Sequence, residues 1–571
     1  MGEKFIVGGP ERFKHQKYGL RRAIETRGRL ALLFDPGLGK SATVIDYASL
    51  LALKLGKSEV RVLVVCPLAA VDTWVDQTSR FVSPLVNYWT EALGGSLLQR
   101  AEALAARGGN PYRKPLKPSA KPRRGADKVA ERALHVHRSI AVAASNQDRT
   151  AQVTAGEGPA GLGTGRPNIV MEVINLDTLT SRAAVGGRTM ADVMLDAVRR
   201  NGPDLLVVDE SHKIKAPTGN ASRVLARIAE HVQRRVILTG TVMPNGPLDV
   251  FAQWRVIDPY AFGHRRRDGS LAKATFGAFK ERYAILGGWM GKEVTGYRNL
   301  DDLQEVMSRN SAVARKEDSL DLPPTTDIVV PVELSPAERK SYNDMKSDLQ
   351  VKLANGVFAT SQSRLTMTLR LRQITAGYIP DDNHVVRVIG KSKAKTAASL
   401  VNDTLAGEKR VVVFTYFTYE LELMAAELAQ RGTEVMVISG GTPDHERIRM
   451  RRKFGSDDPQ RIVMVAQIST MSLAVNELVT ASHCVFACLS QRRDDYIQGR
   501  DRLNRIGQTK PMTFWHLVVP GSVDETILRN HIEKGDLEAA VLNHILQGPD
   551  LSSDPQSMAR ATRGAMSIFG S

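Results

Sequence analysis

The chain has 571 residues, too many for a single hydrophobic core, so two or more domains are expected. Its hydrophobic content of 42% and charged content of 24% are typical of a globular protein. No apolar run approaches the ~20 residues of a membrane span. The start, MGEKFIVGGPERFKH, also lacks the apolar core of a signal peptide. We therefore expect neither a membrane-spanning nor an exported protein.

The formal net charge of +17 suggests a polyanionic partner, most often nucleic acid, with a generally basic surface as the alternative. None of the three cysteines forms a CxxC pair, which excludes a zinc signature and a disulfide framework. Cys484 and Cys488 lie in the apolar run HCVFACL and are expected to be packed core residues. A reducing interior such as the cytoplasm fits this cysteine usage.

The first informative stretch is LLFDPGLGKSATVIDYASLL, in which an expected buried strand (30–34) meets an expected helix (41–53). Gly39-Lys40-Ser41 fits the end of the P-loop pattern GxxxxGK[ST], although Phe34 stands where the leading glycine belongs. In a P-loop, backbone N–H groups from Gly37 onward would face phosphates, Lys40 would reach the β/γ-phosphates and Ser41 would ligate Mg²⁺. An ordinary tight turn is the alternative, so a second motif must decide.

Short apolar runs then recur along the chain, with helical segments between them. Near-continuous Val/Ile/Leu runs predict parallel strands that are covered on both faces. In the first half the predicted strands are 61–67, 168–176, 204–210 and 234–240; in the second half they are 410–416, 434–440, 461–467, 483–489 and 512–519. Strands that alternate with helices indicate an α/β fold, here with two doubly wound lobes.

The expected domains are lobe 1 (1–250), a mostly helical linker region (251–395), lobe 2 (396–547) and a disordered tail (548–571). Within the linker region, Ser335-Pro336 is a plausible helix start. Residues 94–166 have few large apolar side chains and include the basic run KPSAKPRR, so we expect a long, partly disordered insertion in lobe 1. Its basic cluster either touches nucleic acid or forms a solvated loop.

The second motif is LLVVDESHKIK, where a buried strand ends in Asp209 and Glu210. Because α/β sheets place ligands at the carboxyl ends of their strands, Asp209 would hold Mg²⁺ and Glu210 would orient and deprotonate the attacking water. His212 completes a DExH pattern. A solvated loop is the alternative, but the P-loop upstream makes an ATP site the better interpretation.

Together the two motifs resemble those of superfamily-two helicases, and specifically of the Swi/Snf-type ATPases. Further matches follow in that family's order from about Glu11 to Leu546, apart from the insertion. They are ERFKHQKYGL, LVVCPLAAVDTW, VINLDTLT, ILTGTVMPNGPLDVFAQWRVIDP, RKEDSLDLPP, LRLRQITAG, VVVFTYF, YIQGRDRLNRIGQ and VVPGSVDETI. So many motifs in order make the resemblance specific, and it implies two RecA-like parallel-sheet lobes.

For lobe 1, the resemblance implies that Gln16 reads the adenine and that Pro67 and Trp74 belong to a motif after the second strand. Thr239, Gly240, Thr241 and Pro244 match the coupling motif, and 239–241 would report the nucleotide state to the nucleic-acid track. His212 is assigned to the same coupling.

For lobe 2, the final motif QxxxRxxRxGQ is matched by Gln498, Arg502, Arg505, Gly507 and Gln508. Arg502 and Arg505, three apart on an expected helix and so on one face, would act as arginine fingers. Gln498, Ser469 and Thr470 would serve coupling or nucleic-acid contact.

The chain departs from the family pattern in two ways. The stretch QISTMSLAVNEL has no glycine, with Ala474, Val475, Asn476 and Glu477 where a Gly-rich stretch is usual. This departure puts the lobe-2 nucleic-acid contact and its coupling in doubt, but not the ATP site. The large accessory domains of many chromatin remodellers are also missing, which suggests a phage or bacterial member.

These observations predict an ATP- and Mg²⁺-dependent translocase whose track is double-stranded DNA. Two alternatives stay open. One is a helicase that separates the strands of DNA or RNA, for which no wedge signature is evident. The other is an ATP-gated nucleic-acid clamp in which the altered 469–478 stretch prevents movement.

Overall fold

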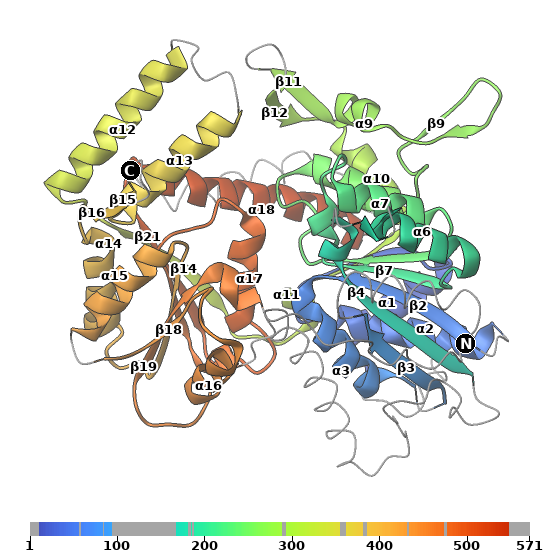
Figure 1. Cartoon of the computed structure of the whole chain (residues 1–571), viewed down its shortest axis with the longest axis horizontal. Coiled ribbons are helices and arrows are strands. Elements are labelled where there is room, and N and C mark those ends of the chain that lie inside the picture. The colour runs from blue at the N-terminus through green and yellow to red at the C-terminus, as the bar shows by residue number, and fades with distance from the viewer. Residues whose placement is uncertain are drawn as a thin grey trace. The chain divides into compact units, whose positions relative to one another are not determined.

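The computed structural model describes residues 11–55, 59–83, 85–93, 167–180, 184–185, 188–287, 293–354, 361–380, 385–430, 433–472 and 477–547. The predicted insertion and the predicted tail lie outside these residues. The chain divides into two compact units (Figure 1). The first runs to Ser319 and includes the described residues from Glu538, and the second runs from Leu320 to Leu537. No helix in the described ranges is long and apolar enough to cross a membrane.

The first unit is built on a seven-stranded parallel sheet with the order β13-β1-β8-β7-β2-β4-β3. The strands are β1 (Arg29–Phe34), β2 (Glu59–Cys66), β3 (Asn87–Ala92), β4 (Asn168–Asn175), β7 (Leu205–Asp209), β8 (Arg234–Leu238) and β13 (Ser311–Ala314). All five strands predicted for this half are present, each within two residues of its expected ends. The pair β5 (Ala184–Val185) and β6 (Arg188–Thr189) forms a small separate ribbon.

Both faces of this sheet are covered, which explains why its strands read as continuous apolar runs. Successive side chains point to opposite faces. Leu206 and Val208 pack in one core with α6 (Met190–Asn201), α7 (Asn220–Ala229) and α8 (Val250–Ile257). Leu205 and Val207 are equally buried on the opposite face, where α1 (Lys14–Glu25), α2 (Lys40–Lys54) and α3 (Val71–Phe81) pack beside one another.

The second unit has a six-stranded parallel sheet with the order β14-β21-β20-β17-β19-β18. Its strands are β14 (Thr325–Pro331), β17 (Arg410–Thr415), β18 (Glu434–Ile438), β19 (Ile462–Gln467), β20 (His483–Phe486) and β21 (Met512–Val518). Its helices include α14 (Ser392–Ser399), α15 (Thr418–Ala429), α16 (Asp444–Phe454), α17 (Arg493–Leu503) and the part of α18 (Val523–Gln547) up to Leu537. Cys484 and Cys488 are buried, as predicted, and burial raises the pKa of both thiols.

The region 251–395 contains long helices, but it also contributes strands that the sequence analysis did not predict. Two of its segments are edge strands of the large sheets. Strand β13 belongs to the seven-stranded sheet, and β14 belongs to the six-stranded sheet. They were missed because SAVA is very short and TTDIVVP is partly exposed, so neither forms a long apolar run. The remainder comprises α9 (Phe276–Tyr283), α10 (Leu300–Arg309), α11 (Lys316–Ser319), α12 (Pro336–Ala354), α13 (Ser361–Thr375) and three two-stranded hairpins: β9 (His264–Arg265) with β10 (Leu271–Ala272), β11 (Ala284–Gly287) with β12 (Glu293–Tyr297), and β15 (Tyr378–Pro380) with β16 (Val386–Val388).

A buried ion pair fastens three helices of the second unit together. The Nζ atom of Lys393 on α14 lies 2.7 Å from Oδ2 of Asp524 on α18, and the two side chains are 1% and 7% exposed. Thr375, the last residue of α13, donates its hydroxyl to Oδ1 of Asp524 at 3.1 Å. Because a lone charge in the interior is costly, each member of the pair depends on the other.

We predict that Lys393→Met lowers the free energy of unfolding of this unit by about 3–5 kcal/mol, because Asp524 is left as an unpaired buried charge. The double variant Lys393→Met/Asp524→Asn should recover most of the loss, because asparagine carries no charge and still accepts from Thr375. Urea denaturation of both variants measures this difference. A double variant that is no more stable than the single one would contradict the explanation.

Candidate functional site

The carboxyl edge of the first sheet gathers three of the predicted motifs. Strand β8 lies between β1 and β7, so the segments that follow these three strands are neighbours. Leu238, the last residue of β8, pairs with Leu32 of β1 on one side and with Asp209 of β7 on the other. The loop at 35–39, the acidic pair at 209–210 and the segment 239–241 therefore meet at one edge.

The loop after β1 has the backbone of a phosphate-binding loop. Gly37 and Gly39 have positive φ values of 91° and 78°. A Cβ atom on Gly39 would lie 2.1 Å from the Gln16 amide nitrogen, so this side chain would have to move, and the positive φ itself favours glycine. Helix α2 begins at Lys40 without a side-chain cap at Gly39, so its first N–H groups are available to an anion.

Phe34, which replaces the leading glycine of the P-loop pattern, has a structural role. It is the last residue of β1, its side chain is buried, and its ring meets that of His15 edge to face with centroids 5.6 Å apart. Its carbonyl accepts a hydrogen bond of 2.8 Å from Nζ of Lys40. The lysine ammonium thus lies at the end of β1, beside the loop that it would serve.

Helix α1 holds the loop from one side. The Gln16 amide nitrogen donates to the carbonyl of Leu38 at 3.2 Å, and Nε2 of His15 lies 2.9 Å from the same oxygen. Arg12 forms a buried ion pair of 2.7 Å with Asp46 of α2. Gln16 therefore lies beside the loop and its amide nitrogen contacts the loop itself, while its contact with the adenine stays a prediction.

Asp209 ends β7 and is held by two donors. Nε1 of Trp74 donates to Oδ2 at 2.8 Å, and the backbone N–H of Glu210 donates to Oδ1 at 2.9 Å. Burial raises the pKa of Asp209, the negative charge of Glu210 raises it further, and the Trp74 hydrogen bond and Lys40 oppose the shift. The sequence resemblance included Trp74 without a role, and the structure shows that it orients this carboxylate.

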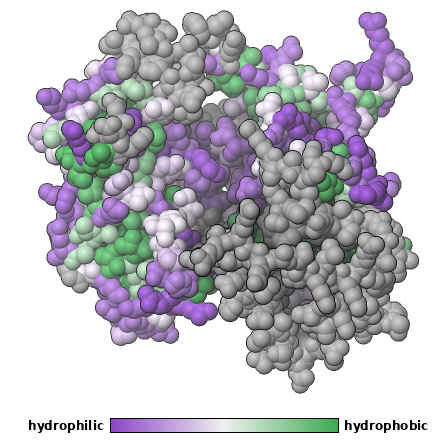
Figure 2. Space-filling model, in the orientation of Figure 1, coloured by the Kyte–Doolittle hydropathy of each residue, from purple (hydrophilic) through white to green (hydrophobic). Residues whose placement is uncertain are grey.

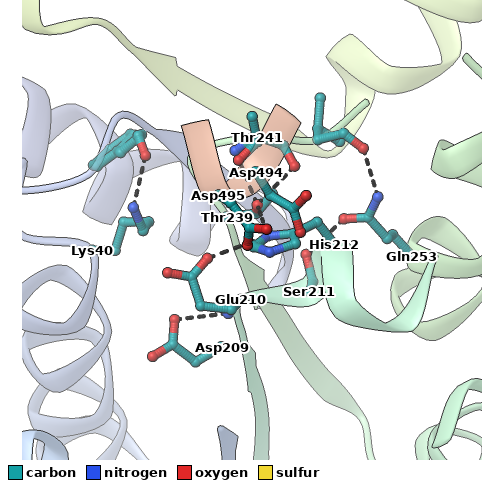
Figure 3. A network of polar contacts seen from close by, with 12 residues as sticks. Lys40, Asp209, Glu210, Ser211, His212, Thr239, Thr241, Gln253, Asp494 and Asp495 are labelled. Atoms are coloured by element: carbon teal, nitrogen blue, oxygen red, sulfur yellow. Dashed lines mark hydrogen bonds and ion pairs between the residues drawn. The ribbon is translucent and has the colours of Figure 1, made fainter. Parts of the chain in front are cut away.

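Glu210 is one of three described non-glycine residues with positive φ, at 50°. This left-handed conformation is strained for glutamate and is typical of functional positions. Its Oε2 lies 3.3 Å from Nδ1 of His212, which in turn lies 3.0 Å from Oγ1 of Thr239. Figure 3 shows the carboxylate, the imidazole and the threonine hydroxyl side by side.

The segment 239–241 contacts both the loop at 35–39 and His212, which lies beside Glu210. Oγ1 of Thr239 donates to the carbonyl of Thr241 at 3.0 Å and accepts from the Thr241 N–H at 3.1 Å. Gly240 approaches Pro36 of the loop so closely that a Cβ atom would lie 2.6 Å from the proline ring. A shift of the loop or of Glu210 would therefore change the contacts of this segment, and its coupling role stays a prediction.

Gln253 on α8 is a residue of this network that the sequence did not single out. It is fully buried, and its Oε1 accepts from the hydroxyl of Ser211 at 2.7 Å. Its Nε2 donates to the carbonyl of Val242 at 2.7 Å and to that of Asp249 at 3.0 Å. Gln253 thus links the residue after Glu210 to the segment after Thr241 (Figure 3). The only sequence signal is a polar residue among the apolar residues of α8.

The final motif lies in the second unit, and one detail differs from expectation. Arg502 is on α17, but this helix ends at Leu503 and Asn504 has φ −87° and ψ 81°, so Arg505 lies past the helix end. The prediction that both arginines share one helix face is therefore wrong. Gln508 closes the motif: its amide donates to the carbonyl of Ala481, and its Oε1 accepts from the N–H groups of Thr509 and Lys510.

Arg500, which the motif pattern does not include, anchors α17 to the sheet. Its guanidinium forms an ion pair with Asp327 of β14 and lies 4.0 Å from the centroid of the Phe514 ring on β21. His516 Nε2 lies 2.9 Å from the same aspartate. Burial alone would raise the pKa of Asp327, but hydrogen bonds from His516 and Arg500 lower it well below its usual range. This cluster orients the helix that carries Gln498 and Arg502.

Ser469 and Thr470 lie in a 3₁₀ turn directly after β19, and Thr470 donates to the carbonyl of Gln467 at 2.7 Å. Glu477, at the end of the glycine-free stretch, pairs with Arg451 of α16 at 3.1 Å. Positions 474–476 lie outside the described residues. The roles assigned to this stretch stay predictions.

The residues of the first unit fit ATP and Mg²⁺. The loop offers uncapped helix N–H groups and a lysine, which suit phosphates. The Ser41 hydroxyl and the Asp209 carboxylate are hard oxygen donors of the kind that Mg²⁺ prefers. The described residues contain no group of three or more His, Cys, Asp and Glu side chains that suits an all-protein metal site.

Comparisons with known proteins match two regions of the chain. Residues 189–377 match an SNF2-related domain, and residues 392–507 match a helicase conserved C-terminal domain. The chain belongs to the SNF2 group of helicase superfamily two. Its two parallel-sheet units are the RecA-like lobes that the sequence predicts. The first match begins after the loop at 35–39, so the prediction that this loop binds phosphates depends on its geometry.

Among curated proteins, the chain is similar to the DNA annealing helicase and endonuclease ZRANB3 of Bos taurus, with 25% identity over 369 residues. It also resembles Protein CHROMATIN REMODELING 4 of Arabidopsis thaliana (24% over 355 residues) and the DNA repair and recombination protein RDH54 of Saccharomyces cerevisiae (23% over 361 residues). The alignments cover 64%, 60% and 59% of this chain, but only 32%, 15% and 38% of the relatives.

Among solved structures, the chain matches the Sulfolobus solfataricus SWI2/SNF2 ATPase core in complex with dsDNA. The identity is 17% and the TM-score 0.34, with 97% of this chain and 100% of that chain covered.

We predict that Trp74→Phe moves the acid limb of the pH profile of kcat/KM for Mg-ATP to higher pH. Protonated Asp209 cannot hold the metal, so activity falls as the pH drops through the raised pKa of this carboxyl. Removing the Trp74 donor raises that pKa further. Trp254→Phe is the matched control, because Trp254 is equally buried in the same unit. If the acid limb does not shift in Trp74→Phe, this hydrogen bond does not control the pKa of Asp209.

We further predict that Gln253→Leu lowers kcat for ATP hydrolysis by about tenfold or more while leaving the KM for ATP within about twofold, because small misplacements of catalytic groups are costly. The substitution removes the acceptor of Ser211, next to Glu210, but leaves the phosphate loop intact. Steady-state kinetics measure the two constants.

Gln304→Leu provides the control for Gln253→Leu. Gln304 is buried on α10 in the same unit, and its amide donates to the carbonyl of Ala540. Gln253→Leu should also lose stability, since it leaves the carbonyl of the buried residue Val242 without this donor, whereas the carbonyl that Gln304 contacts belongs to the exposed residue Ala540. Equal losses of kcat in the two variants would show that Gln253 only stabilises the fold and does not position the residues around Glu210.

Proposed function

We propose that this protein is an ATP-dependent translocase that moves along double-stranded DNA without separating its strands. The observation that carries the proposal is the convergence of Lys40, Asp209, Glu210 and Thr239 at one edge of a parallel sheet. Membership of the SNF2 group supports it, because that assignment includes both the acidic pair and the final arginine motif.

ATP binding would use the loop and α1. The N–H groups at the start of α2 and the Lys40 ammonium would neutralise the phosphates, after Lys40 leaves the carbonyl of Phe34. Ser41 and Asp209 would hold Mg²⁺, which supplies charge neutralisation at the β/γ-phosphates. Gln16 would contact the adenine.

Hydrolysis would depend on Glu210. Its carboxylate would orient the attacking water and accept its proton, with its position fixed by the strained backbone and by His212. Arg502 and Arg505 would stabilise the negative charge of the transition state as arginine fingers. Through His212 and Thr239, the state of Glu210 would reach the coupling segment.

The proposed track is duplex DNA. The net charge of +17 favours a polyanion, and the named relatives include a DNA annealing helicase and a DNA repair and recombination protein. Contacts to phosphates would make binding strongly salt-dependent and nearly independent of sequence. A phage or bacterial source is tested by none of the comparisons and stays a prediction.

Displacement of a third DNA strand from a triplex tests translocation directly. The protein should displace the strand with ATP, while Glu210→Gln should bind ATP and DNA but displace nothing. Lys40→Ala should abolish turnover and leave DNA binding nearly intact.

Turnover that survives Lys40→Ala would refute the phosphate assignment. DNA-stimulated hydrolysis without displacement would favour an uncoupled clamp, and unwinding of a forked duplex would favour a strand-separating helicase.

A further inference from the structure

The hairpin of β9 and β10 carries the sequence HRRRDGSLAK on the first unit. Arg265, Arg266 and Arg267 are consecutive and all exposed. None of the three forms an ion pair with a carboxylate of the described residues. Figure 1 shows the hairpin as a projecting loop, and in Figure 2 the same projection is hydrophilic. The function proposed above assigns it no role.

The tip of the hairpin is a defined turn. The N–H of Arg266 donates to the carbonyl of Ser270 at 2.8 Å, and the N–H of Gly269 donates to the carbonyl of Arg266 at 3.0 Å. The Asp268 carboxylate accepts from the N–H and the hydroxyl of Ser270, which lower its pKa. This acidic group is therefore used inside the turn. Nη1 of Arg265 donates to the carbonyl of Gly269 at 3.2 Å, an exposed contact that leaves the other guanidinium donors of Arg265 for a ligand.

The base of the hairpin is fixed to the body of the unit. Phe262, just before β9, packs edge to face on Phe279 of α9 with ring centroids 4.7 Å apart, and Phe279 also contacts Phe251 of α8. After β10, Lys273 forms an ion pair with Glu230 at the end of α7. The arginines are thus presented by a short arm with a packed aromatic base.

We propose that Arg265, Arg266 and Arg267 form a phosphate-binding arm that contacts the DNA backbone outside the motor core. Guanidinium groups match phosphate oxygens in pairs, and consecutive arginines at a tip can reach successive phosphates. Leu271 is the one large apolar side chain exposed on the hairpin, at 50%, beside three consecutive exposed arginines, and a single apolar residue is little for a protein interface core. Nucleic acid therefore fits better than an acidic protein. This inference rests on the proposed function.

Binding of the full-length protein to duplex DNA across a salt series tests the arm. For Arg265→Ala/Arg266→Ala/Arg267→Ala, the negative slope of log K against log salt should become less steep by about 0.9 for each phosphate that the arm neutralises in the wild type. Replacing the three with lysine should restore most of the slope, because the charge remains. ATP hydrolysis without DNA should equal that of the wild type, which shows that the lobe is folded.

Arg199→Ala/Arg200→Ala/Arg227→Ala is the matched control, since these arginines are exposed on α6 and α7 of the same unit and the charge change is equal. An unchanged slope in the hairpin variant, or an equal change of slope in the hairpin and control variants, would overturn the proposal that the hairpin binds phosphates. An acidic protein would then be the partner to test. Wild-type protein that neither binds duplex DNA nor is stimulated by it would refute the proposed function itself.

Discussion

The site depends on one constraint, the parallel alignment of β1, β8 and β7. Parallel strands end at the same edge of a sheet, so the segments after them meet without any further device. The register brings Leu238 beside Asp209 and Leu32, which places Thr239 between the acidic pair and the phosphate loop. If the order of these strands changed, the three motifs would lie apart even with every residue retained.

At this edge, hydrogen bonds link the neighbouring residues into one network. Trp74 holds Asp209, His212 joins Glu210 to Thr239, and Gln253 ties Ser211 to the segment after Thr241. Each group is held by a partner on another element, so movement at one motif changes the contacts of the next. Such a network suits an enzyme in which hydrolysis must be felt elsewhere in the chain.

Much of this could be predicted from the sequence, and for a clear reason. Central strands buried on both faces form continuous apolar runs, so β1, β7 and β8 were found within two residues. The segments at the sheet edges were not: β3 is only partly buried, and β13 and β14 were assigned to a helical region. Arg505 left its predicted helix because the backbone turns at Asn504, which the pattern of charged residues does not reveal.

The roles of supporting residues could not be predicted, because they depend on contacts between distant segments. Gln253 is 42 residues from Ser211, and Trp74 is 135 residues from Asp209. In sequence, Gln253 is one of two polar residues, with Arg255, in an otherwise apolar helix. Arg500 is one of several arginines in α17, and only its contacts with Asp327 and Phe514 distinguish it.

The most direct test of the account is the rate of ATP hydrolysis by the purified protein alone and with single-stranded DNA, duplex DNA or duplex RNA. A DNA-tracking motor whose substrate is the duplex predicts strong stimulation by duplex DNA and little by the other two. Stimulation mainly by single strands or RNA, or by none of the three, would contradict it.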